Sequence, residues 1–381
     1  MNPILFFLGI ISAFSLLTFY IIKRLINKLD IKQKYKNYLK IFYILNVVGI
    51  VFYVLGRYYI DMPNTLYYLT SIPIGILFLS FMVAVLHDIF HMLLNKTNLS
   101  SSRRDMFKKT LDVSSLIAAT ALSAKAMSNA TNVEIEDVEI DIKGLKKEYK
   151  IVQLSDVHIG GLIDKEFVSS MVKRVNNLKP DLVVITGDLV DMDVHRIQSV
   201  LDELKFLKSK YGTYFIVGNH EYFHDIKTII KAVKALGIRV LENENIYIGE
   251  EGEGFNLAGV YDMFGFRVGH HLPDIPKALE GKKESPTVML AHQPKHLELI
   301  SGGVDLVLSG HTHGGQIYPF GLLAQLQQPY ISGLHQHTED MQIYVNKGTG
   351  FWGPPMRLGA SSEITNITIK PSYDPNETRK Y

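Results

Sequence analysis

Long apolar runs dominate the first third of the chain. Residues 4–22 carry no charge, residues 41–60 carry only Arg57, and residues 62–94 carry a single charge, at Asp88. A helix of about 20 apolar residues is long enough to cross a bilayer, and Arg57 lies near the end of its run, where a long side chain reaches the membrane surface. The pattern predicts three transmembrane helices. The alternative is a buried bundle in a soluble protein, although such helices normally carry a polar face.

From residue 133 onward, short apolar strands alternate with segments of helical spacing. Strands are expected at residues 138–142 (as an edge strand), 149–154, 181–186, 214–217, 288–291 and 306–309, and helices at residues 167–178, 194–207 and 226–236. Alternation of this kind predicts an α/β domain. Two later strands, at residues 341–345 and 364–369, follow without intervening helices and favour a second, more antiparallel sheet.

The two patterns divide the chain into three parts. We expect a membrane region over residues 1–128, with three or four transmembrane helices, and an α/β domain over residues 133–370. Residues 371–381 are polar and are expected to form a flexible tail.

The charges between the apolar runs predict their orientation in the membrane. Residues 23–40 hold seven basic side chains against one acidic one, and residues 96–109 are again rich in lysine and arginine, whereas residues 61–65 hold none. Cytoplasmic loops carry the excess of basic residues. The first and third connections are therefore expected in the cytoplasm of a multi-pass inner-membrane protein, with the amino terminus outside.

A possible export signal follows the third run. Residues 102–108 (SRRDMFK) resemble a twin-arginine signal, residues 111–124 are weakly apolar with one charge at Asp112, and residues 124–126 (AKA) look like a cleavage site. This interpretation makes the twin-arginine export machinery a partner and favours an extracytoplasmic position for the α/β domain. The alternative is a basic helix lying on the inner membrane surface, with the domain in the cytoplasm.

The third run contains a pair of histidines. His87 and His91 are four residues apart and therefore share one face of a helix. Ionisable groups at membrane depth are functional candidates, but the interpretation we favour places these two, with Asp88, at the level of the lipid headgroups, where water satisfies them.

The amino-acid composition limits which partners and which metal ligands are expected. Lysine and arginine total 40 against 38 aspartates and glutamates, so the charge gives no reason to expect nucleic acid as a partner. The chain has no cysteine. Any bound metal ion must therefore have nitrogen and oxygen ligands.

Five polar blocks each fall just after a predicted strand. They are residues 156–158 (DVH), 187–188 (GD), 218–221 (GNHE), His292 and residues 310–313 (GHTH). Ligands gather at the carboxyl ends of strands in α/β sheets, and the glycines before Asp188, Asn219 and His311 allow sharp turns. Carboxylate, imidazole and carboxamide groups suit manganese, iron, zinc or magnesium. The blocks therefore predict a metal cage.

In this order, the blocks resemble those of the calcineurin-like metallophosphoesterases, and the resemblance covers roughly residues 149–370. It implies a two-sheet sandwich flanked by helices, and two divalent metal ions, with manganese favoured. One ion would be held by Asp156, His158, Asp188 and His313, and the other by Asp188, Asn219, His292 and His311. His220 matches the histidine that assists catalysis in the family without binding metal.

The substrate is expected to be a phosphodiester or pyrophosphate. Residues 188–191 (DLVD) lack the arginine that follows the bridging aspartate in protein phosphatases of this superfamily. Residues 348–365 resemble the membrane-anchored bacterial branch, which includes hydrolases of UDP-2,3-diacylglucosamine in lipid A biosynthesis. The resemblance thus implies a phosphorylated lipid or a nucleotide-sugar lipid, and Tyr222 and Arg357 are candidates for contact with it.

Two questions stay open at this point. UDP-2,3-diacylglucosamine is made on the cytoplasmic face, so an outward-facing domain favours an envelope phospholipid instead. The protein can also be a membrane-anchored sensor or scaffold that uses a phosphoesterase fold without turnover, although the complete ligand set and His220 favour the enzyme.

Overall fold

The computed structural model describes residues 3–58, 60 and 62–372, so most of the predicted tail lies outside the described residues. The chain divides into two units. The helical unit consists of Met1–Asn129 and Gly353–Leu358, and the sheet unit consists of Ala130–Trp352 and Gly359–Tyr381.

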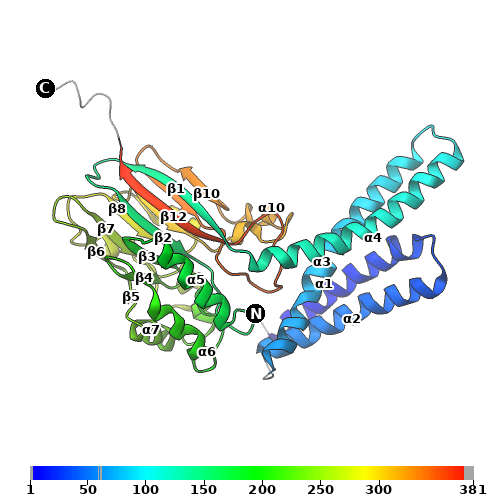
Figure 1. Cartoon of the computed structure of the whole chain (residues 1–381), viewed down its shortest axis with the longest axis horizontal. Coiled ribbons are helices and arrows are strands. Elements are labelled where there is room, and N and C mark those ends of the chain that lie inside the picture. The colour runs from blue at the N-terminus through cyan, green and yellow to red at the C-terminus, as the bar shows by residue number, and fades with distance from the viewer. Residues whose placement is uncertain (1–2, 59, 61, 373–381) are drawn as a thin grey trace. The chain divides into compact units, whose positions relative to one another are not determined.

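The helical unit is built from long helices (Figure 1). They are α1 (Pro3–Arg24), α2 (Gln33–Tyr58), α3 (Asn64–Asn95) and α4 (Ser101–Thr131). Within the described residues, three helical segments are long and apolar enough to cross a membrane: Phe7–Lys28, Gln33–Arg57 and Asn64–Asn95. Less than half of each span is buried inside the protein, so many apolar side chains of these helices face outward.

The export-like segment lies within α4, which continues through the weakly apolar residues without a break. At the predicted cleavage site Ala126 is buried, and its carbonyl accepts a hydrogen bond from the backbone N–H of Arg357 at 2.8 Å. Cleavage and export stay predictions.

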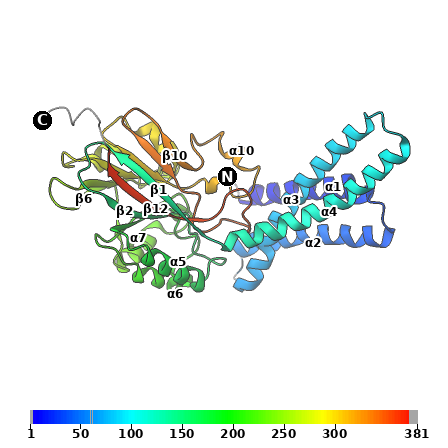
Figure 2. The same cartoon turned by 45° about the horizontal axis from the view of Figure 1, so that its top comes forward.

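The sheet unit contains two six-stranded sheets (Figure 2). In spatial order, the first sheet holds β1 (Glu134–Ile142), β12 (Glu363–Pro371), β2 (Tyr149–Leu154), β3 (Leu182–Thr186), β4 (Thr213–Ile216) and β5 (Arg239–Val240). The second holds β10 (Gly333–Gln336), β11 (Gln342–Val345), β9 (Leu306–Ser309), β8 (Thr287–Leu290), β7 (Phe255–Gly259) and β6 (Glu244–Ile248). The predicted edge strand is β1, which pairs only with β12 in the first sheet.

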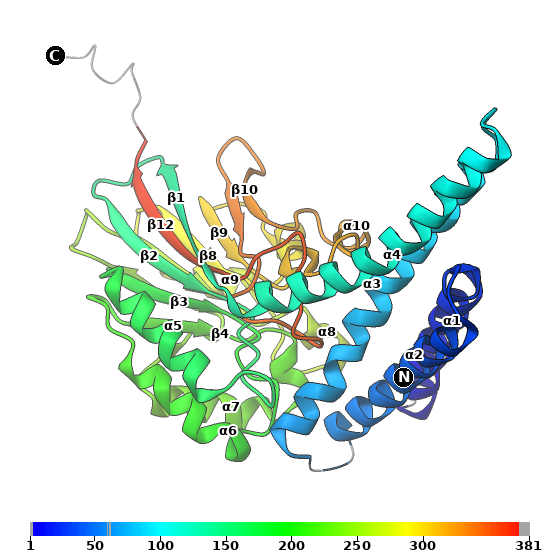
Figure 3. The ribbon, with the colours of Figure 1, turned by 45° about the vertical axis from the view of Figure 1, so that its right-hand side comes forward.

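Alternating side chains of the strands fill three apolar layers, one between the sheets and one on the outer face of each sheet. On β2, Ile151 joins the core between the sheets, while Val152 faces the helices. Strands buried on both faces are almost continuously apolar, which is why β3 (LVVIT) was recognisable in the sequence. The helices α5 (Lys165–Asn177), α6 (Val194–Leu201) and α7 (Ile226–Ala235) cover the outer face of the first sheet (Figure 3).

Short elements complete the fold. They are α8 (Phe264–Val268), α9 (Ile275–Leu279), α10 (Gly321–Ala324) and the 3-10 helices η1 (Ile26–Lys28), η2 (Asp202–Phe206), η3 (His220–Phe223), η4 (Pro294–Leu299) and η5 (His313–Gly315). Side chains of α9 and η4 pack on the outer face of the second sheet.

The two-sheet sandwich is confirmed, but the expected grouping of the late strands is wrong. The last strand, β12, lies in the first sheet, parallel to β1 and antiparallel to β2. The second sheet is mixed: β7, β8, β9 and β11 run parallel, and only its two edges pair antiparallel. Alternation along a strand shows which faces are buried, but it does not identify the neighbouring strand.

Candidate metal centre

The loops that follow five parallel strands deliver the predicted ligands. Asp156 and His158 follow β2, Asp188 follows β3, and Asn219 follows β4. The remaining ligands, His292, His311 and His313, follow β8 and β9 of the second sheet. The strands β2, β3 and β4 run parallel in the first sheet, and β8 and β9 run parallel in the second. Their carboxyl ends therefore share one edge in each sheet, and both sheets contribute to one site.

One group of ligands gathers around Asp156. The Nε2 atoms of His158 and His313 lie 3.0 Å apart, and His313 Nε2 lies 3.4 Å from Asp156 Oδ1. All three side chains are buried. Possible ligand atoms of the three residues lie within 4.8 Å of one another, close enough to share one ion.

A second group gathers around Asp188. The Nε2 atom of His292 lies 3.2 Å from Asp188 Oδ2 and 3.1 Å from Asn219 Oδ1. His311 completes the group: its ring centroid is 5.1 Å from that of His292, and Asp188, His292 and His311 also offer ligand atoms within 4.8 Å of one another. The structure thus gathers all seven predicted ligands in two groups. The sharing of Asp188 between the two groups stays a prediction.

The backbone of these loops is tightly bent. The φ angle is positive at five ligands, an unusual conformation for residues other than glycine: Asp156, His158, Asp188, His311 and His313. Such backbone conformations are concentrated at functional sites. Gly218 is required for a different reason, because a Cβ atom there would lie 2.2 Å from Asp188 Oδ1 and 2.8 Å from His292 Nε2.

Two acidic residues that sequence reasoning missed support the ligands. Glu221 is fully buried and accepts hydrogen bonds from the backbone N–H groups of Asp188, Val190 and Gly218. It therefore holds the β3 and β4 loops together. The available signal was its position directly after His220, in the block that follows β4. The sequence alone did not show whether this acidic side chain is buried against the backbone or exposed to solvent.

His220 is positioned by Asp191, the second of these residues. Asp191 Oδ1 lies 2.7 Å from His220 Nδ1, and the backbone N–H of His220 donates to Asp188 Oδ1 at 2.8 Å. The ring lies between two half-exposed aromatic side chains, at 5.0 Å from Phe223 and 5.8 Å from Trp352 between centroids. His220 Nε2 lies 3.9 Å from Asp188 Oδ2, so the ring borders the predicted ligands. His220 also offers a ligand atom within 4.8 Å of those of His158 and Asp191.

The buried charges strongly perturb one another. Burial alone would raise the pKa of Asp188, but the charges of His292 and His220 hold that pKa well below its usual range. Burial, only partly opposed by His292, raises the pKa of Asp156 to about 6. Burial together with the charge of His292 lowers the pKa of His311 to about 3, which leaves that imidazole neutral and able to bind metal.

These residues fit a pair of divalent cations. Asp156 Oδ1 is buried, and within the described residues it accepts no hydrogen bond. An unpaired buried carboxylate oxygen is costly, and a cation would satisfy it. The donors are nitrogen and oxygen atoms, which suits manganese, iron or zinc.

Comparison with known proteins supports this assignment. Residues 149–315 match the family model described as calcineurin-like phosphoesterase. An uncharacterized metallophosphoesterase of Helicobacter pylori is 40% identical over 334 residues, which cover 87% of this chain and 89% of the relative. The chain belongs to the calcineurin-like metallophosphoesterase family.

The sequence similarity to other metallophosphoesterases extends into the helical unit. An uncharacterized metallophosphoesterase of Campylobacter jejuni is 32% identical over 369 residues, 95% of this chain and 97% of the relative. A Danio rerio protein named transmembrane protein with metallophosphoesterase domain is 37% identical over 278 residues, 69% of this chain and 63% of the relative. With the three apolar helices, these similarities support association with a membrane.

Tyr222 and Arg357, the two residues predicted to contact the substrate, have surroundings that the sequence did not predict. The hydroxyl of Tyr222 donates to the backbone carbonyl of His271 at 2.5 Å, and its ring stacks on His270. Arg357 is fully buried and belongs to the helical unit. Contact of either residue with substrate stays a prediction.

Proposed function

We propose that this metallophosphoesterase hydrolyses a phosphodiester or pyrophosphate bond in a lipid-linked substrate. The candidate substrates are an envelope phospholipid and a nucleotide-sugar lipid such as UDP-2,3-diacylglucosamine. The family and the ligand set support hydrolysis of a phosphoester. An exposed apolar segment beside the metal ligands supports the lipid.

Two divalent ions, with manganese favoured, would lower the pKa of a bound water and neutralise phosphate oxygens. The protein supplies the remaining groups. Asp191 holds Nδ1 of His220, which orients Nε2 toward the ligands. From there, His220 is placed to donate a proton to the leaving oxygen, a role that requires a positioned imidazole.

The apolar segment comprises residues 318–326 and begins five residues after His313. It includes α10 and exposes five large apolar side chains, Tyr318, Phe320, Leu322, Leu323 and Leu326, of which Leu326 is 80% exposed. The side chain of Gln316, just before the segment, pairs with the backbone of Trp352, the residue whose ring contacts His220. Exposed apolar patches mark interaction sites, and this one would accept an acyl chain while the phosphate lies at the metal ligands.

Turnover in mixed micelles tests the proposal. We expect the detergent-purified protein with manganese to cleave a lipid phosphodiester or pyrophosphate as well as soluble bis-p-nitrophenyl phosphate. Combined Leu322→Ser, Leu323→Ser and Leu326→Ser changes should lower lipid turnover about tenfold and spare the soluble diester. Phe206→Ser is the matched control, because Phe206 is similarly exposed in η2 of the same unit.

The outcomes separate the parts of the proposal. Turnover of the soluble diester alone would refute the lipid substrate. Absence of turnover with both substrates, with metal bound, would favour a scaffold. If the protein is a scaffold, a His220→Ala variant would keep its cellular role. If the protein is an enzyme, the same variant would lose that role.

The orientation of the sheet unit decides between the candidate lipids. We propose that it faces outward, exported through the twin-arginine machinery, which favours an envelope phospholipid. The basic connection of residues 23–40 supports a cytoplasmic first loop. A reporter fused after Lys370 that is active only in the cytoplasm would reverse the orientation and favour the nucleotide-sugar lipid.

A further inference from the structure

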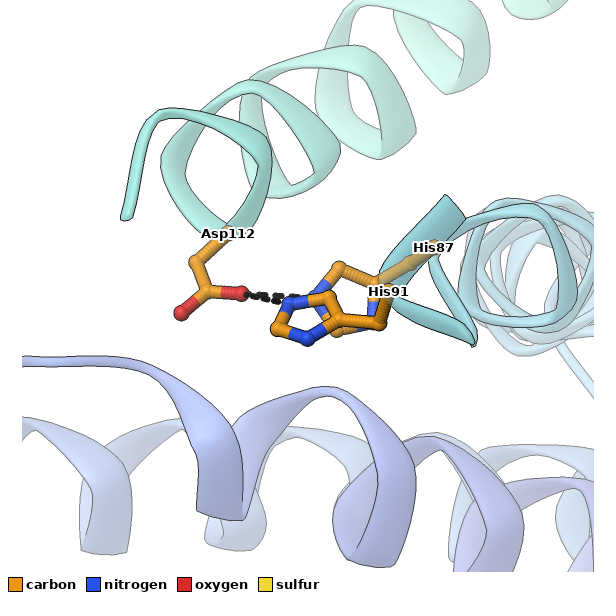
Figure 4. A group of neighbouring side chains, drawn as sticks. All are labelled: His87, His91 and Asp112. Carbon is orange, nitrogen blue, oxygen red and sulfur yellow. Dashed lines mark hydrogen bonds and ion pairs between the residues drawn. The ribbon is translucent and has the colours of Figure 1, made fainter. Parts of the chain in front are cut away.

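A second cluster of metal-ligand side chains lies in the helical unit. His87 and His91 project from α3 toward Asp112 of α4 (Figure 4). Their Nε2 atoms lie 2.7 and 2.9 Å from the same oxygen, Asp112 Oδ1. The ring centroids of the two histidines are 4.3 Å apart. Asp112, which in the sequence only interrupted an apolar stretch, is thus the meeting point of two imidazoles.

The cluster is removed from solvent. The side chain of His87 is 0% exposed, that of Asp112 is 7% exposed, and that of His91 is 14% exposed. Within the described residues, Nδ1 of His87 has no hydrogen-bond partner. No group at Nδ1 therefore reinforces the tautomer in which Nε2 donates to Asp112, and Nε2 can bind a cation once its proton has moved to Nδ1 or left the ring.

The neighbouring acidic side chain, Asp88, is paired with residues outside the cluster. Asp88, next to His87 in sequence, accepts a hydrogen bond from Tyr20 at 2.8 Å and pairs with Arg24 and with Lys28, the latter at 2.8 Å. Because Asp88 is neutralised by these groups, it does not compete for the histidines. Among the residues that the structure describes, Asp112 is the one carboxylate that contacts both rings.

We propose that His87, His91 and Asp112 bind a divalent transition-metal ion of the zinc class that clasps α3 to α4. Two histidines spaced i and i+4 on one helical face form a familiar zinc-binding pair. A carboxylate from a second helix supplies a third ligand, and three protein ligands leave a coordination position for water. Possible ligand atoms of the three side chains already lie within 4.8 Å of one another.

Only a small adjustment is needed to admit the ion. Ligands at about 2.0–2.1 Å from zinc in a tetrahedral site are roughly 3.3 Å apart. The present separations of 2.7 and 2.9 Å must widen by about 0.5 Å, which side-chain rotation provides. A hydrogen-bonded clasp without metal is the competing outcome.

Metal stoichiometry of the full chain in detergent tests the proposal. After loading with zinc or cobalt(II) and removal of excess ion, elemental analysis of Asp112→Asn should show one equivalent fewer than wild type. Asparagine can still accept hydrogen bonds from the histidines, so folding need not change. Asp105→Asn, an exposed site on the same helix, should bind as much metal as wild type.

His91→Gln is the second variant, because His91 is the most accessible member of the cluster. It should also lose one equivalent, together with part of the visible absorption of bound cobalt(II). Hydrolysis of bis-p-nitrophenyl phosphate should persist in both variants, which would show that the other metal ligands are still loaded. Equal metal content in wild type, Asp112→Asn and His91→Gln would overturn the proposal and leave a hydrogen-bonded clasp.

Discussion

Substitution of Gly218 by alanine probes how closely the metal ligands are packed. A Cβ atom at this position would lie 2.2 Å from Asp188 Oδ1, 2.5 Å from Asp188 N and 2.8 Å from His292 Nε2. Two of these atoms belong to the predicted ligand groups, and the third is backbone held by Glu221. None of them is the free end of a flexible side chain, so the ligands themselves must move.

The size of the movement follows from the contact distances. Non-bonded atoms approach to roughly 3.5 Å, so Asp188 and the new methyl group must separate by about 1 Å. Overpacking of this kind costs about 1–3 kcal/mol of folding free energy. A displacement of about 1 Å in a reacting group lowers the rate by about 10²-fold. Activity should therefore fall much further than stability.

The assay compares Gly218→Ala with Gly160→Ala. A Cβ atom at Gly160 would be 3.5 Å from the carbonyl oxygen of Asp191, an ordinary contact. We expect kcat/KM for bis-p-nitrophenyl phosphate to fall about 10²-fold in Gly218→Ala, with loss of bound manganese, and to stay near wild type in Gly160→Ala. A Gly218→Ala protein with wild-type turnover and metal content would show that the ligands are not packed as described.

Three further perturbations test the parts of the site separately. Asp191→Asn should lower kcat by about 10²-fold with unchanged metal content, because His220 loses the carboxylate that orients it; unchanged kcat would remove Asp191 from the mechanism. Glu221→Gln should lower the free energy of unfolding by about 1–3 kcal/mol in chemical denaturation, because its NH₂ group cannot accept from the backbone N–H groups that the carboxylate satisfies. Removal of metal by a chelator should lower the melting temperature, since free metal at 100 times its dissociation constant stabilises the folded state by about 2.7 kcal/mol; an unchanged melting temperature would mean that no metal binds the folded protein.

The sequence predicted best where one physical rule determined the outcome. Strands buried on both faces are largely apolar, so β9 (LVLS) was predicted with its observed bounds. Ligands follow the carboxyl ends of parallel strands, and so residues as distant as Asp156 and His313 were placed in one site. The long apolar helices needed only a count of uncharged residues.

Sequence reasoning failed where pairing between distant segments decides the structure. Nothing local to β12 shows that it inserts between β1 and β2. Asp191 contacts His220, and Glu221 accepts three hydrogen bonds from backbone N–H groups. No spacing rule predicts these contacts. Asp112 is 21 residues from His91, and only the pairing of α3 with α4 brings them together.

We propose that the two groups of predicted ligands hold two cations that share Asp188. Electron paramagnetic resonance of the full chain, loaded with two equivalents of manganese(II), tests it most directly. Ions about 3.5–4 Å apart are magnetically coupled. We predict the spectrum of a coupled pair, replaced by that of isolated ions in Asp188→Asn. A spectrum of isolated manganese in the wild-type protein would contradict the account.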